Sequence, residues 1–306
     1  MSDKDIHSQR RMAVARRWLT GVPYEVAFWR SYYANRKRRR QLMEWSQYDR
    51  ECSLDDFDIA AFIASCPTEE PLLLDVGCAM SYAFGNIVGG RPRKVVYIDP
   101  LAPFYNRILR RFRIDRPEIS FGMAEYLSAT NAGIRADFIH IRNALDHCAD
   151  PMEGILQALA SLRVGGVLYL NHFDNEALRE AYRGFHQYNL TEEDGKLLIW
   201  DRKLRKTWVD DTVAPFASVR TTVTPAGRVV AVITKTAEVP LSVVDPAETA
   251  RRLGLLTIEI VDWHHSLPHA IRYQWLRLFC TAGHRIVRRL PFWMQRRLKW
   301  LFGRFM

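Results

Sequence analysis

The sequence lacks several patterns that would place it in a special class of protein. Its five cysteines are scattered, odd in number and without CxxC or Cys/His spacing, which argues against a disulfide framework and against a zinc site. No apolar run approaches the roughly 20 residues that a membrane-spanning helix needs. The charged start also lacks the apolar segment of a secretory signal. We therefore expect a globular protein of the cytoplasm.

Acidic residues are absent after Asp262, although the formal net charge of the whole chain is already +10. Arginines alternate there with bulky apolar residues over 267–306, and a second basic cluster lies at 36–40. Helical spacing would place the two kinds of residue on opposite faces, as in helices that lie on an anionic membrane surface. A core helix with a solvated basic face is the alternative. The pattern therefore adds an expectation of peripheral attachment at the inner face of the cell membrane.

The chain divides into three parts by pattern. Residues 1–66 indicate a helical N-terminal extension or lid, whose last helix starts near Ser53 and runs to Ala64. Residues 67–262 form an α/β domain, and residues 263–306 form a basic amphipathic helical tail.

The α/β part alternates short apolar runs with helical stretches, which is typical of a parallel sheet covered on both faces. The predicted strands are 72–76, 95–98, 119–121, 138–142 and 167–171, with helices at 105–113 and 151–162. Right-handed crossovers between them predict a doubly wound domain.

The later part of this domain is less regular. A strand at 196–200 is followed by strands at 219–223 and 229–234, which we expect to form a hairpin within an insertion at about 196–235. A helix at 246–253 and a strand at 257–261 then complete the edge of the sheet.

Two predicted strands end in carboxylates, as in proteins that bind adenosine-containing cofactors. The first ends at Asp75 and is followed by Gly77, where a backbone without Cβ can approach a ligand. Simple turn geometry is the alternative for this glycine. The second strand ends at Asp99, and an acid at that position can accept both ribose hydroxyls.

These residues resemble the class I S-adenosylmethionine-dependent methyltransferases, of the type 11/12-like group, whose first motif is D-V-G-C-G-x-G or a relaxed version. The matching segments are LLLDVGCAMSYAFG (72–85), IDPLA (98–102), GMAEY (122–126), DFIHIRNALDH (137–147) and LRVGGVLYL (162–170). They cover about a third of the chain in the family's order and spacing. The resemblance implies a doubly wound, mostly parallel, seven-stranded α/β sheet, with S-adenosyl-L-methionine as the cofactor.

The resemblance also implies which residues contact the cofactor. They are Asp75, Gly77, Ala79, Ser81, Asp99, Pro100, Ala124, Glu125 and Asn143. Asp75 would lie near the methionine end, Asp99 at the ribose and Glu125 beside the adenine. Ala79 and Ser81 depart from the family, which usually has glycine at both positions. The methyl group of Ala79 adds bulk where the cofactor passes closest, and the Ser81 hydroxyl offers a hydrogen bond to its carboxylate.

Methyl transfer to oxygen requires a base beyond the carboxyl ends of the strands. His147, oriented by Asp146 or Asp150, is the first choice, and His172 is the second. His186 is expected to contact the acceptor, together with Asp146. The alternative for both candidate bases is a structural role in capping a helix or shaping a loop.

A metal-assisted mechanism would need a carboxylate cluster, and Asp146 with Asp174 and Asn175 is the set that the sequence offers. Capping of the helix that starts at Asn175 is the commoner role for Asp174. We therefore predict no metal.

The expected acceptor is a sugar hydroxyl of a lipid-linked glycan or a related small molecule, because the first motif and IDPLA look like those of methyltransferases associated with surface polysaccharides. Nucleic acid is not favoured, since the Asp/Asn-Pro-Pro-Tyr motif is missing and Asn143-Ala-Leu-Asp stands in its place. Two alternatives remain open: an RNA methyltransferase, and an inert scaffold that regulates a glycan-assembly complex. Hydride transfer is not supported, because G-x-G-x-x-G is absent.

Overall fold

The computed structural model describes residues 21–264, except 24, 131–134 and 183–184, together with isolated positions between 267 and 294. The chain divides into two compact units. The larger unit is Leu42–Leu253, and the other combines Met1–Gln41 with Gly254–Met306. All strands found in the described part of the chain belong to the larger unit.

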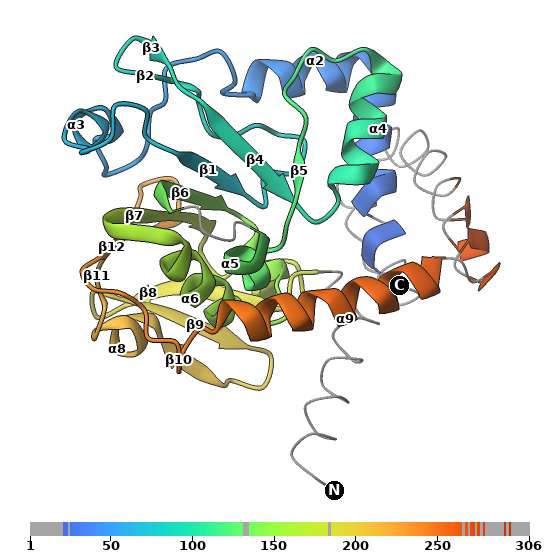
Figure 1. The fold of residues 1–306 in the computed structure, drawn as a ribbon. Coiled ribbons are helices and arrows are strands. Elements are labelled where there is room, and N and C mark those ends of the chain that lie inside the picture. Colours follow the sequence, from blue (N-terminus) through green and yellow to red (C-terminus); the bar gives the residue numbers. More distant parts are fainter. Residues whose placement is uncertain are drawn as a thin grey trace, which may run out of the picture. The chain divides into compact units, whose positions relative to one another are not determined.

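A seven-stranded sheet forms the centre of the larger unit, in the order β11-β12-β7-β6-β1-β4-β5 (Figure 1). The strands are β1 (Leu73–Val76), β4 (Val95–Asp99), β5 (Ser120–Phe121), β6 (Ala136–Arg142), β7 (Leu162–Phe173), β11 (Ala217–Val223) and β12 (Arg228–Lys235). Neighbouring strands from β5 to β7 pair in parallel, whereas β12 is antiparallel to both β7 and β11. The structure thus confirms the predicted mostly parallel sheet of seven strands.

Helices and two small sheets complete the described structure. Residues 21–23 and 25–34 are helical, and the helices with defined bounds are α2 (Arg36–Trp45), α3 (Ile59–Ala64), α4 (Ala102–Phe112), η1 (Ala124–Tyr126), α5 (Leu127–Thr130), η2 (Leu145–His147), α6 (Pro151–Ser161), α7 (Glu176–Arg179), α8 (Val209–Val213) and α9 (Pro246–His264). A three-stranded sheet has β9 (Lys196–Asp201) between β10 (Lys206–Trp208) and β8 (Tyr188–Glu193). The pair β2 (Ile87–Val88) and β3 (Arg91–Pro92) forms a short ribbon.

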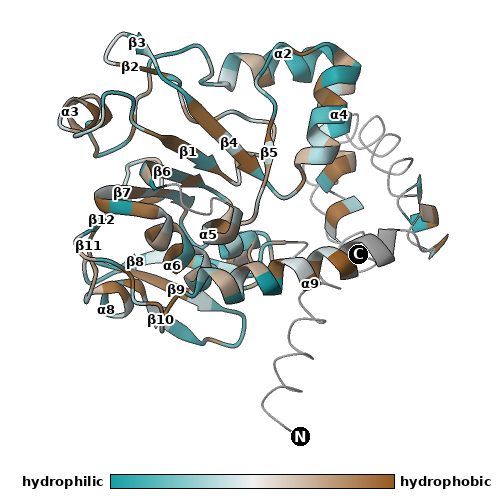
Figure 2. Cartoon of the chain, viewed as in Figure 1, coloured by the Kyte–Doolittle hydropathy of each residue, from teal (hydrophilic) through white to brown (hydrophobic). Residues whose placement is uncertain are grey.

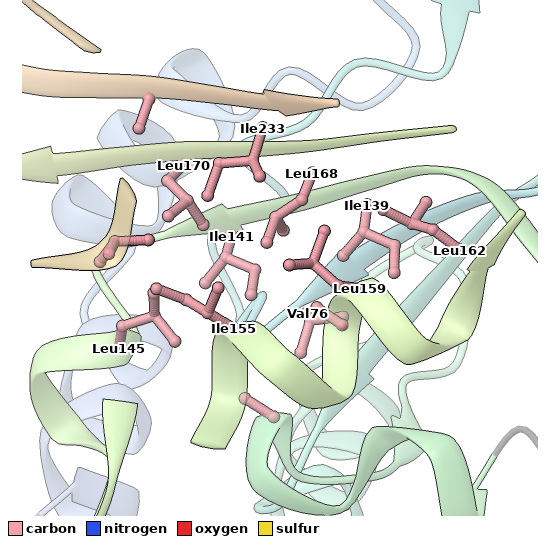
Figure 3. Packing of buried hydrophobic residues seen from close by; sticks show 14 of the residues in the cluster. Val76, Ile139, Ile141, Leu145, Ile155, Leu159, Leu162, Leu168, Leu170 and Ile233 are labelled. Atoms are coloured by element: carbon pink, nitrogen blue, oxygen red, sulfur yellow. The ribbon is translucent and has the colours of Figure 1, made fainter. Parts of the chain in front are cut away.

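Side chains of the main sheet alternate between two buried faces, as the pleat of a strand requires. On one face, Leu159 and Ile155 of α6 pack against the odd-numbered apolar positions of β6 and the even-numbered ones of β7 (Figure 3). On the other face, Ile59 and Ile63 of α3 belong to a cluster with Phe138. Burial on both faces explains why β1 and β4 are mostly apolar up to the aspartate in each, as their largely brown colour shows (Figure 2).

Residues 42–66 contribute to this core, although they precede the segment in which the sequence shows a sheet pattern. Besides Ile59 and Ile63, Cys52 is buried in the same cluster. Helix α3 begins later than predicted, because the side chain of Asp58, and not Ser53, caps it by accepting a hydrogen bond from Ala61 N.

The strand predicted at 257–261 is wrong, because these residues lie within helix α9. The β-branched residues there suggested a strand, but β propensity depends on a neighbouring strand to pair with. The edge of the sheet is already formed by β11, which pairs with β12.

The insertion predicted at about 196–235 also needs correction. Strand β9 belongs to the small three-stranded sheet, whereas the hairpin β11–β12 supplies the last two strands of the main sheet. Strands β9 and β12 are both short apolar runs with consecutive buried positions, so the sequence pattern alone does not distinguish the sheets that they join.

No helix among the described residues is long and apolar enough to cross a membrane. Most of the predicted basic tail, 263–306, and residues 1–20 of the N-terminal extension lie outside the described residues.

Candidate active site at the carboxyl ends of the parallel strands

The loop after β1 turns through left-handed backbone conformations at Gly77 and Ala79, with φ of 70° and 47°. At Gly77 an added Cβ would overlap the Cβ of Ala144, so close packing against the loop after β6 requires glycine here. This packing is a different reason from the ligand approach that the sequence suggested.

Ala79 occupies the position at which the family usually has glycine, and it keeps the backbone conformation that favours glycine. Its N–H donates a hydrogen bond of 2.9 Å to Asp99 Oδ2, which holds this conformation in place. Ser81 Oγ donates to the carbonyl of Cys78 at 3.0 Å, so its hydroxyl stabilises the same turn. The departure from the motif therefore changes the side chains and preserves a glycine-like turn.

Asp99 lies buried at the end of β4 and connects three segments. While Oδ2 accepts from Ala79, Oδ1 accepts a hydrogen bond of 2.8 Å from Leu101 N. Pro100 lies between Asp99 and Leu101 in the sequence, at the turn into α4. The carboxylate thus fixes the loop after β1 and the start of α4 to the same strand end.

Asp75 forms a buried pair with His140, which lies beside it on β6. The two residues are register partners, and Asp75 Oδ1 and His140 Nδ1 are 2.7 Å apart. The His140 ring stacks between Phe84 and Tyr169. Asp75 Oδ2 is buried without a hydrogen-bond partner in the described structure.

Glu125 is buried in η1 next to Ala124. Its Oε1 accepts a hydrogen bond of 2.8 Å from Ala149 N, which links η1 to the loop that follows η2. Burial raises the pKa of the Glu125 carboxyl.

Asn143 follows β6 with a left-handed φ of 48°. Its side-chain oxygen accepts hydrogen bonds of 3.1 Å from Phe173 N and from Arg228 Nη2. The side chain therefore joins the ends of β6, β7 and β12.

A cluster of one carboxylate and two imidazoles lies beyond the ends of β6 and β7; we call Asp146, His147 and His186 the acid–imidazole cluster. Asp146 Oδ2 is 2.7 Å from His186 Nδ1 and 3.4 Å from His147 Nε2, and the two ring nitrogens are 3.2 Å apart. The side chains of His147 and His186 are 30% and 26% exposed, whereas that of Asp146 is only 1% exposed. The structure thus brings together three residues that the sequence predicted for catalysis and for acceptor contact.

Electrostatics in the cluster keep its carboxylate ionised. Burial would raise the pKa of Asp146, but the imidazoles of His147 and His186 outweigh it and lower the pKa to about 2. For His186, burial acts to lower the pKa, and the hydrogen bond with Asp146 raises it above its ordinary value.

His172 and Glu176 lie near this cluster with pKa values shifted by burial. His172 is fully buried on β7, and neither ring nitrogen has a hydrogen-bond partner among the described residues. Burial lowers its pKa to about 4, so it is neutral at neutral pH. This position gives little support to the prediction of His172 as a base. Burial also raises the pKa of Glu176 to about 7, with a further contribution from Asp146.

The structure separates the other acids from the cluster. Asp150 does not orient His147, because its side chain accepts from Met152 N and Glu153 N as the N-cap of α6. Asp174 accepts from Thr191 Oγ1 at 2.6 Å and from the Asn175 amide, and it caps no helix. The carboxylate set of Asp146, Asp174 and Asn175 is therefore not the one whose ligand atoms converge.

Three residues of this region escaped the sequence interpretation: His140, Glu176 and Arg228. The only sequence signal for His140 was a histidine within an otherwise apolar strand, DFIHI. Arg228 is buried beside Asn171 and Asn143, about 85 positions away in sequence from the latter. Such pairings depend on strand order and leave no local pattern.

Comparisons with known proteins give structural likenesses only. No family model matches the sequence, and no curated protein matches it. A SAM-bound amino pentose methyltransferase, CalS10 from Micromonospora echinaspora, is 19% identical over 58% of this chain and 89% of its own, with a TM-score of 0.37. An S-adenosylmethionine-dependent methyltransferase from Clostridium acetobutylicum is 10% identical over 60% and 94%, with a TM-score of 0.36. The 16S rRNA methyltransferase RsmC of T. thermophilus is 13% identical over 58% and 38%, with a TM-score of 0.35.

We predict that His172 makes folding stability depend on pH. The unfolded chain binds a proton at His172 near pH 6.5, whereas the folded protein does so only near pH 4. Stability is therefore lost as pH falls through this window, by about 3 kcal/mol in total. Urea unfolding at pH 4 to 7.5 should show that His172→Leu loses less stability than the parent chain over this range. Equal losses in both proteins would contradict the buried, neutral imidazole.

Proposed function

We propose that the chain is an S-adenosylmethionine-dependent methyltransferase. The observation that carries this proposal is the Asp99 carboxylate, which holds the left-handed turn at Ala79 to the end of the second parallel strand, β4. A strand-end carboxylate beside such a turn is the arrangement that binds the ribose of an adenosine-containing cofactor. The acid–imidazole cluster follows strand β6, which is separated from β4 by β1, and an acceptor bound there would meet the cofactor across the end of β1.

The residues present fit this cofactor. The backbone at Ala79 turns as glycine would, and Asp75 Oδ2 is a buried acceptor atom without a hydrogen-bond partner in the described structure. Asp75 and the turn would bind the methionine end, Asp99 the ribose, and Glu125 the adenine edge. Bound there, S-adenosylmethionine would supply a methyl group on a positively charged sulfur.

When no metal ion is bound, we propose that His147 is the base that accepts the proton of an acceptor hydroxyl. His147 is the most exposed member of the acid–imidazole cluster, and the ionised carboxylate of Asp146 stabilises positive charge on it. The chain then has two tasks: to align the acceptor oxygen and to remove its proton. His186, which is hydrogen-bonded to Asp146, lies beside the same position and offers an acceptor contact.

A sugar hydroxyl of a glycan, or of a related small molecule, is the acceptor that we propose. The imidazoles and the Asp146 carboxylate of the cluster, with the carboxyl group of Glu176 near it, suit hydrogen bonding to a neutral polyol. Phe185, whose ring lies 5.7 Å from the ring of His147, adds an apolar surface at this point.

Calorimetry with S-adenosylmethionine tests the cofactor assignment. We expect the full chain to bind it, and Asp99→Asn to weaken binding at least about tenfold, because a charged hydrogen bond contributes roughly 1.5–3 kcal/mol. Asp201→Asn is a matched control, since Asp201 is also a buried acid that accepts from two backbone N–H groups, those of Lys203 and Arg205, in the three-stranded sheet. An absence of binding by the parent chain would favour an inert scaffold.

Replacing His147 tests the catalytic role. His147→Ala should lower the rate of methyl transfer about 100-fold or more, while the affinity for S-adenosylmethionine stays nearly the same. The rate can be followed with labelled cofactor and extracts separated into glycan, protein, RNA and small molecules. Unchanged turnover would remove His147 from the site, and label in the RNA fraction would replace the proposed acceptor.

We also propose that residues 267–306 attach the protein to an anionic membrane surface. Among the few described residues there, Leu267, Ile271, Trp275 and Leu278 are exposed apolar side chains at intervals of three or four positions. This spacing forms one apolar stripe on a helix, and the arginines between them would face anionic lipid headgroups.

Flotation with vesicles of anionic or neutral lipid tests this attachment. We expect binding to anionic vesicles only, and loss of binding in the double variant Ile271→Glu, Trp275→Glu. Leu204→Glu is the control, because Leu204 is more exposed than either residue but lies outside the tail. Retained binding by the double variant would show that the stripe does not contact lipid.

A further inference from the structure

The three ligand-type atoms of the acid–imidazole cluster converge on one point. Asp146 Oδ2, His147 Nε2 and His186 Nδ1 are separated by 2.7, 3.2 and 3.4 Å. Ligands that bind one first-row transition ion at about 2.1 Å are themselves about 3.0 to 3.4 Å apart, in octahedral or tetrahedral geometry. The spacings of 3.2 and 3.4 Å fall in this range, and the 2.7 Å contact between Asp146 and His186 is a hydrogen bond that has to lengthen by about 0.3 Å when both atoms bind one ion.

Hydrogen bonds among Asp146, His147 and His186 do not satisfy all the polar atoms of the cluster. If the proton on His186 Nδ1 serves the contact with Asp146, that nitrogen cannot accept a hydrogen bond from His147 Nε2, whose own distance to Asp146 Oδ2 is long, at 3.4 Å. Asp146 Oδ1 is buried and has no hydrogen-bond partner in the described structure. A cation would bind both nitrogen lone pairs and would use the buried carboxylate.

The backbone around the cluster is fixed, as a preformed ion site requires. Asp146 and His147 lie in η2, and His186 lies just before β8. Gln187 N donates to the carbonyl of Asp146 at 3.0 Å, and Tyr188 Oη donates to the carbonyl of Ala149 at 2.8 Å. These bonds hold the two ligand-bearing segments together.

We propose that Asp146, His147 and His186 bind a divalent first-row transition ion such as Zn²⁺. Two imidazoles and one carboxylate are ligands that suit such ions, whereas Mg²⁺ prefers oxygen alone. Partial exposure of both histidines leaves coordination positions for an outside oxygen atom, as in catalytic sites. This inference rests on the proposed function in one respect, because the ion would lie where the acceptor oxygen is held. With the ion bound, His147 would be a metal ligand and would no longer be the base.

Zinc titration of the full chain, stripped with a chelator and monitored by competition with a chromophoric chelator, tests ion binding without any measurement of methyl transfer. We expect one Zn²⁺ per chain, no competition by Mg²⁺, and at least about 100-fold weaker binding in His186→Ala and His147→Gln, since even the loss of an outer partner weakens metal sites 10- to 100-fold. Asp174→Asn is the control and should bind Zn²⁺ as the parent does, because Asp174 lies outside the converging set.

Substitution with Co²⁺ gives a second signal if a variant folds poorly. Visible absorption of the bound ion should appear in the parent chain and in Asp174→Asn, and it should be absent from His147→Gln, whose substituted side chain is partly exposed. The proposal is overturned if the parent chain binds no Zn²⁺, or if binding persists in both histidine variants. Failure of ion binding would leave the cofactor calorimetry unaffected, so the two proposals are tested separately.

Discussion

The carboxylate of Asp99 is the interaction on which the geometry of the site depends. Through its two oxygens it holds the N–H groups of Ala79 and Leu101, and thereby fixes the loop after β1 and the start of α4 at one strand end. Because this loop packs at Gly77 against Ala144, its position also determines that of the segment leading into η2. One buried acid thus fixes two parts of the candidate site, the loop after β1 and, through it, the segment leading into η2.

Burial divides the ionisable groups around the strand ends into two kinds. Asp75 with His140, and also His172, lie within the packed sheet, where burial favours neutral or paired groups. His147 and His186 lie at its border with solvent and share one buried carboxylate. Of these ionisable groups, only His147 and His186 are partly exposed and can exchange protons, ions or an acceptor with solvent, and this is the physical basis of the proposal that the chemistry occurs there.

The sequence predicts the cofactor side better than the acceptor side, for a structural reason. Asp75 and Asp99 each end an apolar run, so their placement follows from the local pattern and from the rule that parallel strands end at one edge. The pairing of Asp75 with His140 depends instead on the register between β1 and β6, and the approach of His186 to Asp146 depends on the path of the chain into β8. Neither of these two contacts produces a periodic pattern in the sequence.

The same distinction explains the errors in the fold. Residues 257–261 have strand-like composition, but they pair with no strand and continue helix α9. The hairpin β11–β12 resembles an insertion in sequence, yet β12 pairs with β7 through seven register positions of the main sheet. Local propensity describes what a segment can form, and tertiary pairing selects among these forms.

A crystal structure of the chain with S-adenosylhomocysteine bound would test the account most directly. The account predicts the ribose hydroxyls at the carboxylate of Asp99, the adenine beside Glu125, and the sulfur facing the acid–imidazole cluster across the turn at Ala79. A ligand bound elsewhere, with Asp99 still holding Ala79 and Leu101 and touching no ribose, would contradict it.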